Sequence, residues 1–407
     1  MRLSLRSRRL SAAALVVAAV CLWCSSRAPS RGETCLSPFI KRLDRPETLL
    51  YVSCSSLDGK HNDFVGVVDA DPASPRYGKM VYQLDLGTHG NEMHHWGYTD
   101  DRTRIWACGL FSDKIYIVDV ASDPARPRLE KVVDVGAGLS GPHTAYALPG
   151  RMLLTFLSGK DGGLPAGLAE FSNDGRFIRR LDLPKDAPYM HDVAIKPELN
   201  RMVTSSFTPA SNYKIPRARW DFNNFGKELL IWDFKERKVQ QTFRIGGAPF
   251  EVRWSVKQGN PLGYVICLAD NSLWAWEGNS AGEYQVRKLG TTGKLPSDLK
   301  QSPDDRFLYV SCTDSDVIQQ WDVSDVAKPR LSGSVSPGEH PHMIHISPDG
   351  KRLYVTNNLL STVDRTTNYW VHLIRVGPEG MKLDPSFAID LRDLPTGPAR
   401  AHDMLLR

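Results

Sequence analysis

Residues 347–355, with the sequence SPDGKRLYV, decide the fold. Their Pro-Asp-Gly portion suits a tight turn, because Pro presets φ and Gly accepts a positive φ, and the apolar residues after it are typical of a β-strand. The same arrangement returns at residues 302–310 (SPDDRFLYV), and in looser form at residues 197–203 and 149–154. The chain therefore repeats a unit in which a turn leads into a strand.

A second repeated phrase is an apolar strand that ends in Asp or a degenerate equivalent. Its seven copies are residues 65–69 (VGVVD), 115–119 (IYIVD), 167–171 (GLAEF), 229–233 (LLIWD), 272–276 (SLWAW), 317–322 (VIQQWD) and 371–376 (VHLIRV). Units of this length with several short strands are typical of propeller blades. We therefore predict one all-β domain over residues 33–407, a seven-bladed β-propeller.

The last strand-like segment, residues 401–406, has no blade of its own. We expect it to complete the blade that begins at residues 49–53. Such closure removes the two free sheet edges that an open ring of blades would leave.

Residues 1–32 have the features of an export signal. Four arginines within residues 2–9 precede an apolar run at residues 12–23 and a polar, small-residue run at residues 25–32. This order predicts a secretory signal of the Sec or twin-arginine type, and the apolar run is too short for a comfortable membrane span. We expect an exported, periplasmic protein without a membrane span in its mature form; the alternative is a cytosolic protein with an apolar N-terminal helix.

The charge pattern excludes some partners. The net charge is only +5, and basic residues outside the N-terminus are interleaved with acidic ones. This is the pattern of an ordinary solvated surface, so we expect no nucleic-acid binding. Cys108, Cys267 and Cys312 lie in strand-like runs, so we expect them to be buried small side chains.

Histidine recurs at one register of the repeat, six residues before the Pro of the turn phrase or its equivalent. This position is His95, His143, His191, His342 and His402 in five blades, and Glu251 and Ser297 in the other two. The first strand of a propeller blade lines the central channel, so one register forms one ring around the axis. A single histidine would be interpreted as structural, but five at one register predict a metal site.

The predicted ligands are His94, which adjoins His95, and the five histidines of the ring. Imidazole suits copper, zinc, iron or nickel, and copper binds such nitrogen sites most tightly by the Irving–Williams order. Glu92 and Glu251 could orient these imidazoles.

Several longer phrases resemble the selenium-binding protein family, whose members include methanethiol oxidases. The phrases are residues 67–77 (VVDADPASPRY), 91–98 (NEMHHWGY), 320–325 (QWDVSD) and 397–402 (GPARAH). The resemblance spans residues 49–404. It implies a seven-bladed propeller that oxidises methanethiol with O2 and water to formaldehyde, hydrogen sulfide and hydrogen peroxide, with copper and a periplasmic location in bacterial members.

The resemblance also bears on single residues. His94, His95, His143 and His402 fall on histidines of the family's motifs, whereas His191 and His342 match only some branches. Gly78 stands where the family has its selenium-linked cysteine, which argues against selenium binding of that kind. A long insertion that typical members carry before residues 341–343 is absent, and we expect its absence to open the channel mouth.

The favoured function is a copper-dependent oxidase with a small thiol and O2 as partners and a copper chaperone as a candidate donor of the metal. Glu92, Glu251, Asp192 or an unliganded histidine could move protons. One alternative is a non-catalytic propeller that binds copper or selenium. Another is a calcium-dependent propeller hydrolase or lactonase, against which the histidines argue because calcium prefers oxygen ligands. The sequence leaves the oligomeric state open.

Overall fold

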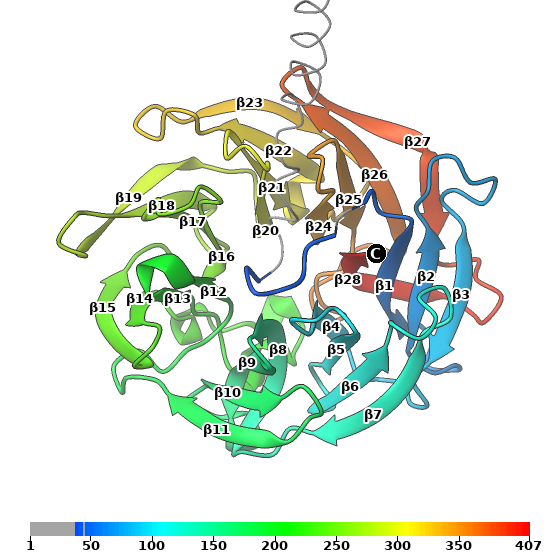
Figure 1. Ribbon diagram of the computed structural model, residues 1–407, viewed down its shortest axis with the longest axis horizontal. Coiled ribbons are helices and arrows are strands. Elements are labelled where there is room, and N and C mark those ends of the chain that lie inside the picture. The colour runs from blue at the N-terminus through cyan, green and yellow to red at the C-terminus, as the bar shows by residue number, and fades with distance from the viewer. Residues whose placement is uncertain (1–36, 44) are drawn as a thin grey trace, which may run out of the picture.

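The computed structural model describes residues 37–43 and 45–407, which form seven four-stranded antiparallel sheets around a central axis (Figure 1). This confirms the predicted seven-bladed β-propeller. The predicted export segment, residues 1–32, lies outside the described residues. Within them, no helix is both long enough and apolar enough to cross a membrane.

Each blade runs from an innermost strand at the axis to an outermost strand at the rim. The first four blades, inner strand first, are β28 (Ala399–Leu406), β1 (Leu49–Ser56), β2 (Phe64–Asp69), β3 (Met80–Asp85); β4 (Met93–Tyr98), β5 (Arg104–Gly109), β6 (Lys114–Asp119), β7 (Arg128–Asp134); β8 (Leu139–Leu148), β9 (Arg151–Gly159), β10 (Gly167–Ser172), β11 (Phe177–Asp182); and β12 (Val193–Lys196), β13 (Arg201–Thr204), β14 (Glu228–Asp233), β15 (Lys238–Arg244).

The remaining three blades are β16 (Pro249–Trp254), β17 (Leu262–Cys267), β18 (Ser272–Gly278), β19 (Tyr284–Thr291); β20 (Pro296–Gln301), β21 (Phe307–Cys312), β22 (Val317–Asp322), β23 (Arg330–Val335); and β24 (Ile344–Ile346), β25 (Arg352–Thr356), β26 (Trp370–Gly377), β27 (Gly380–Asp390). The seven copies of the apolar phrase are the third strands of the seven blades. They are apolar because neighbouring blades cover both of their faces, whereas an outer strand such as β15 alternates between exposed and half-buried residues.

Strand β28 closes the ring. It pairs antiparallel with β1, with Leu406 opposite Leu50 and Ala401 opposite Cys54. The Tyr98 hydroxyl on the next blade donates a hydrogen bond of 2.9 Å to the Leu406 carbonyl. The predicted closure by the C-terminal strand is therefore confirmed.

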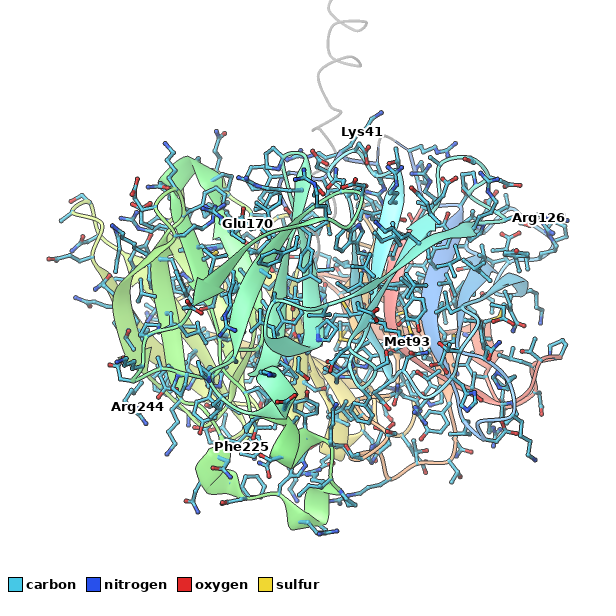
Figure 2. All side chains as sticks on the ribbon, turned by 90° about the horizontal axis from the view of Figure 1, so that it is seen from below. Lys41, Met93, Arg126, Glu170, Phe225 and Arg244 are labelled. Atoms are coloured by element: carbon cyan, nitrogen blue, oxygen red, sulfur yellow. The ribbon has the colours of Figure 1, made fainter. Side chains whose placement is uncertain are left out.

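The two ends of the central channel differ. Figure 2 shows Lys41 and Phe225 on opposite faces of the disc. On the Phe225 face, residues 206–226, including the short helix α2 (Ala210–Tyr213), pack with residues 357–363 in one apolar cluster. On the Lys41 face, residues 37–42 border a cavity. One end of the channel is thus closed by apolar side chains, and the other is open to solvent.

The cysteines of the described residues are all reduced and buried, as expected for Cys108, Cys267 and Cys312; the fourth is Cys54. Burial raises the pKa of each thiol, to about 12 for Cys312. A thiol with a raised pKa is a poor nucleophile and a poor metal ligand at neutral pH. Chemistry in the described part of the chain must therefore come from other side chains.

Gly97 offers a test of how closely the inner strands pack. A Cβ at this position would lie 2.1 Å from the carbonyl oxygen of Ala145 on the neighbouring inner strand β8. We expect Gly97→Ala to lower the free energy of unfolding by about 3 kcal/mol, because the backbone of β8 must move away. Chemical denaturation would measure the loss. Gly377→Ala, where a Cβ meets nothing within 4 Å, is the control and should change stability far less.

Candidate metal centre

The inner strands place six imidazoles around the channel axis. His94 and His95 lie on β4, His143 on β8 and His402 on β28, while His191 and His342 come two residues before β12 and β24. All six are at most 6% exposed. Glu251 on β16 and Ser297 on β20 occupy the same register in the other two blades. The register derived from the repeat therefore corresponds to one physical ring.

Neighbouring imidazoles of this ring are close together. Ring centroids lie 4.7 Å apart between His342 and His402, 3.6 Å between His402 and His94, 4.8 Å between His94 and His143, and 4.2 Å between His143 and His191. His95 lies 4.3 Å from His143 and 4.9 Å from His402. The six rings thus form one continuous arc across five blades.

The donor atoms suit a metal ion. One ring nitrogen each of His94, His95 and His143 lies within 4.8 Å of the other two. Several buried nitrogens have no hydrogen-bond partner: Nδ1 of His94, Nε2 of His402, and both nitrogens of His191 and His342. Buried polar atoms are almost always satisfied in native proteins, so a cluster of unsatisfied imidazoles fits a bound metal ion.

Hydrogen bonds prepare two of the imidazoles as ligands. Nδ1 of His402 lies 2.9 Å from the carbonyl oxygen of Asn358, to which only an N–H can donate. Nδ1 of His143 lies 3.2 Å from Oγ1 of Thr144, whose hydroxyl donates to Asp192. In both rings the proton on Nδ1 leaves the lone pair on Nε2, the form that a metal requires.

Hydroxyl side chains on second strands, or just beyond them, fix the ring residues across blade boundaries. Each donates to a backbone carbonyl at or next to the ring position of the following blade: Ser53 to His94, Thr155 to His191, Ser205 to Phe250, Thr313 to Pro341 and Thr356 to His402. This set was not predicted from the sequence. The available signal is a Ser or Thr in or just after the second strand, but its distance from the turn varies from blade to blade.

A charged network borders the ring on the side of the cavity. The Arg253 guanidinium contacts Asp192 Oδ2 and Glu251 Oε2, each at 2.6 Å. Burial raises the pKa of Glu251 to about 8, assisted by the negative charge of Asp192. Burial also acts to raise the pKa of Asp192, but Arg253 outweighs it and lowers that pKa to about 2. Two adjacent carboxyls thus have widely separated pKa values, an arrangement suited to proton transfer.

The pKa values of the six histidines also fall into two groups, five lowered and one raised. Burial, together with neighbouring histidines, lowers the pKa of His94, His143, His342 and His402 well below the usual value, and burial does the same to His191. For His95, burial also acts to lower the pKa, but the hydrogen bond with Asp403 and the charge of Glu251 produce a net rise. Five imidazoles are therefore neutral and ready to bind metal at neutral pH.

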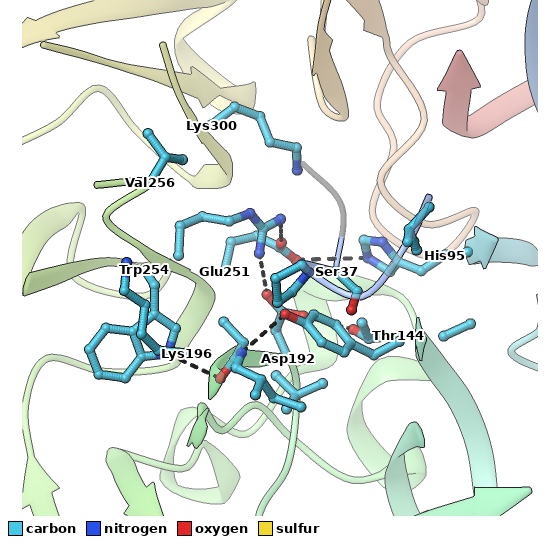
Figure 3. Close-up of a pocket in the computed structure, with 18 of the residues that line it drawn as sticks. Ser37, His95, Thr144, Asp192, Lys196, Glu251, Trp254, Val256 and Lys300 are labelled. Carbon is cyan, nitrogen blue, oxygen red and sulfur yellow. Dashed lines mark hydrogen bonds and ion pairs between the residues drawn. The ribbon is translucent and has the colours of Figure 1, made fainter. Parts of the chain in front are cut away.

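A cavity of about 800 Å³ leads from the Lys41 face to the ring. Of the six histidines only His95 lines it, together with the predicted residues Asp192 and Glu251. Figure 3 shows these two carboxyls between His95 and Trp254. At the other end, Phe250 stacks on His191 at 3.6 Å and Phe207 contacts both rings. A small molecule would therefore reach the ring through the cavity, with His95 first.

Glu92, a predicted proton carrier, lies elsewhere. Its carboxylate accepts hydrogen bonds from the amide and hydroxyl of Ser361 at 3.0 and 2.6 Å, and from Arg400 at 2.9 Å. It does not line the cavity. Both of its oxygens are thus engaged in holding the segment that carries Asn358, the hydrogen-bond acceptor of His402. Glu92 is therefore placed to orient His402 through this segment, one of its two predicted roles, and its role in proton transfer stays a prediction.

We expect Glu92→Gln to lower the free energy of unfolding by about 3 kcal/mol, because it leaves Arg400, whose side chain is only 12% exposed, without its anionic partner. It should also weaken metal binding by about tenfold through the displaced Asn358 carbonyl. Denaturation and metal titration would measure these effects. Glu130→Gln, which breaks a half-exposed ion pair with Arg104, is the control and should alter neither property by comparable amounts.

Comparisons with known proteins find relatives that match most of the chain. The family model described as 56 kDa selenium-binding protein matches residues 31–407. Proteins named methanethiol oxidase from a Hyphomicrobium species and from Ruegeria pomeroyi are 34% and 30% identical to this chain. Each match covers 91% of this chain, and respectively 89% and 92% of the relative.

Solved structures support the fold. A hypothetical selenium-binding protein from Sulfolobus tokodaii superposes with a TM-score of 0.81 at 24% identity, over 89% of this chain and 94% of that one. The periplasmic gluconolactonase of Pseudomonas aeruginosa superposes with a TM-score of 0.62 at 14% identity, over 88% and 98% of the two chains. At these identities the likeness concerns the fold alone.

Proposed function

Because the chain belongs to the 56 kDa selenium-binding protein family, we propose that it is a copper-dependent methanethiol oxidase. The reaction converts methanethiol, O2 and water to formaldehyde, hydrogen sulfide and hydrogen peroxide. The observation that carries the proposal is the ring of buried imidazoles at the end of a cavity, in a chain 34% identical over most of its length to a protein named methanethiol oxidase.

Copper is the metal that this donor set favours. Four imidazoles, those of His94, His95, His143 and His402, would hold it, and two of them already carry their proton on the outer nitrogen. Nitrogen donors without competing thiolates favour copper over magnesium, calcium or manganese. Bound copper would supply affinity for a thiolate and electron transfer to O2.

The chain's own residues would bind the substrate and move protons. A thiol must lose a proton to become a good metal ligand, and methanethiol must reach the ring past His95. Glu251 lies 3.8 Å from His95 Nε2, and its raised pKa makes it a base near neutral pH. Asp192, held ionised by Arg253, keeps His143 oriented through Thr144. The apolar side chains below His191 exclude water from the opposite side.

Two alternatives make different predictions. A non-catalytic copper-binding propeller would share the ring but would consume no O2 with thiols. A calcium-dependent hydrolase or lactonase would need oxygen ligands, whereas this register offers five histidines, one Glu and one Ser. The likeness to a gluconolactonase concerns only the fold.

We also propose that the protein is exported to the periplasm. The support is the order of charged, apolar and polar runs in residues 1–32. Cell fractionation with mass analysis of the mature N-terminus tests this, and recovery of the intact chain from the cytosol would contradict it.

The test of the function combines metal analysis with oxygen consumption. We expect about one catalytic copper per chain, and O2 uptake on addition of methanethiol that yields hydrogen sulfide and hydrogen peroxide in equal amounts. Bound copper without O2 uptake would favour the non-catalytic alternative. Calcium alone, or no metal, would contradict the proposed metal site.

A further inference from the structure

The imidazole arc has more donors than one copper ion uses. A metal with bonds of about 2.0–2.2 Å can bridge two donor atoms at most about 4.4 Å apart. The arc runs in the order His342, His402, His94, His143 and His191, with neighbouring ring centroids 3.6–4.8 Å apart. His191 therefore lies at one end of the arc, beyond His143 and three positions from His402.

Glu251 stands between His95 and His191. Its Oε1 lies 3.8 Å from His95 Nε2 and 3.9 Å from His191 Nδ1, too far for hydrogen bonds to either. Oε1 has no hydrogen-bond partner, and neither nitrogen of His191 has one. The two side chains are 1% and 0% exposed. Both separations are longer than a hydrogen bond but shorter than the roughly 4.4 Å that one metal ion can bridge.

Arg253 holds Glu251 in this orientation. It binds the other oxygen, Oε2, at 2.6 Å, which directs Oε1 toward the two imidazoles. Phe250 fixes the His191 ring from the opposite side by stacking on it at 3.6 Å. The donor atoms therefore sit on side chains whose remaining contacts restrain them, as expected of a built site.

The local charge also favours a cation. Four buried carboxylates lie at this end of the ring: Asp192, Glu251, Asp298 and Asp403. Asp192, Glu251 and Asp298 pair with Arg253 or Lys300, and Asp403 lies 3.4 Å from Nδ1 of His95. The four carboxyl groups outnumber the two permanent cations, which favours the binding of a cation beside them.

We propose that the ring holds a second metal ion, bound by His191 Nδ1, Glu251 Oε1 and His95 Nε2, separate from the ion at His94, His143 and His402. Two imidazoles and one carboxylate suit a borderline divalent ion, Zn²⁺ or Cu²⁺. Because His95 and Glu251 line the cavity, a fourth position faces solvent. When both ions are bound, His95 serves the second, and the first retains three imidazoles.

Metal stoichiometry on the full chain tests this proposal. Stripped protein would be saturated with Zn²⁺ or Cu²⁺, freed of excess metal by gel filtration and measured by mass spectrometry of the elements. We expect two ions per chain, and one ion in Glu251→Gln and in His191→Gln. Ser297→Ala, at the same register of the ring, is the matched control and should keep two. One ion in the wild-type chain, or two in both variants, would overturn the proposal.

A second measurement covers the case in which the variants fail to fold. Wild-type protein loaded with one equivalent of Cu²⁺ would be titrated with Zn²⁺, and we expect one further Zn²⁺ to bind without displacing copper. Displacement of copper, or no uptake of zinc, would contradict a second site. Both counts are independent of oxidase activity, so a protein with two metals and no O2 uptake would refute the proposed function alone.

Discussion

Replacement of His143 and His402 by alanine is expected to remove the catalytic copper ion and to lower thiol-dependent O2 uptake by about 1,000-fold. Both imidazoles carry their proton on Nδ1 and direct Nε2 to the centre of the ring, so their loss removes two prepared ligands. Catalysis by a bound metal supplies several kcal/mol of transition-state stabilisation, which corresponds to a factor of that size. Metal analysis and an oxygen electrode would measure the two losses.

His89→Ala is the control for this variant, because His89 is exposed and lies outside the ring. It should keep its copper and its activity. A copper content equal to that of the wild-type chain would show that other ring residues, such as His191 and His342, hold the catalytic metal. Lost copper with unchanged O2 uptake would separate the activity from the metal altogether.

The metal-free protein is expected to lose stability steeply as the pH falls from 7 to 5. Five histidines have folded-state pKa values well below the usual value: His94, His143, His191, His342 and His402. Unfolded chains take up protons on these histidines below about pH 6.5, whereas the folded protein does not, so acid favours unfolding. Their contribution to stability is complete above that pH and declines below it.

Two buried carboxyls oppose this trend. Burial raises the pKa values of Glu251 and Asp364 to about 8. Between about pH 4.5 and 8 the folded protein therefore holds two protons that the unfolded chain has already released. The five ring histidines less the two carboxyls leave a difference of about three protons, or ~4 kcal/mol per pH unit near pH 5.5. Burial also lowers the pKa values of His340 and His372, which adds to the slope in the same direction. Denaturant titrations across this pH range would measure the slope.

His342→Gln should reduce the pH dependence of the free energy of unfolding by ~1.4 kcal/mol per pH unit, because glutamine does not titrate. This change corresponds to one proton fewer taken up on unfolding. A metal-free protein whose stability is independent of pH between 5 and 7 would show that the buried imidazoles are solvated or already protonated.

The fold could be predicted from sequence because blade strands carry their own pattern. The third strands are buried on both faces and are apolar in sequence. The turn before the second strand is Pro-Asp-Gly in residues 347–355 and Pro-Asp-Asp in residues 302–310, with a positive φ at Gly350 and at Asp305. The ring followed from the same alignment. Similar turns join the inner strand of a blade to its second strand. Residues that lie the same number of positions before this turn therefore lie at the same height along the channel axis in every blade.

The roles of the acidic residues could not be predicted in the same way. Glu92 adjoins Met93 and His94 in sequence, but its backbone has a φ of 52° and its side chain contacts Ser361, 269 residues away. Glu251 shares its register with the histidines, but its separation from His95 and His191 depends on Arg253, which orients it from the same strand. Such contacts depend on packing between blades, and they cannot be predicted from the pattern of residues within one strand.

Closure by β28 has a consequence for how the protein acquires its metal. This strand contributes His402 and is held to β1 by contacts such as that between Ser53 and Asp403, 350 residues apart in the chain. Contacts of such long separation form late, because the loop entropy must be lost first. The last step of folding therefore also assembles the ligand set. A metal ion that binds only the closed ring would stabilise that ring against opening. The added free energy would rise with the logarithm of the free metal concentration.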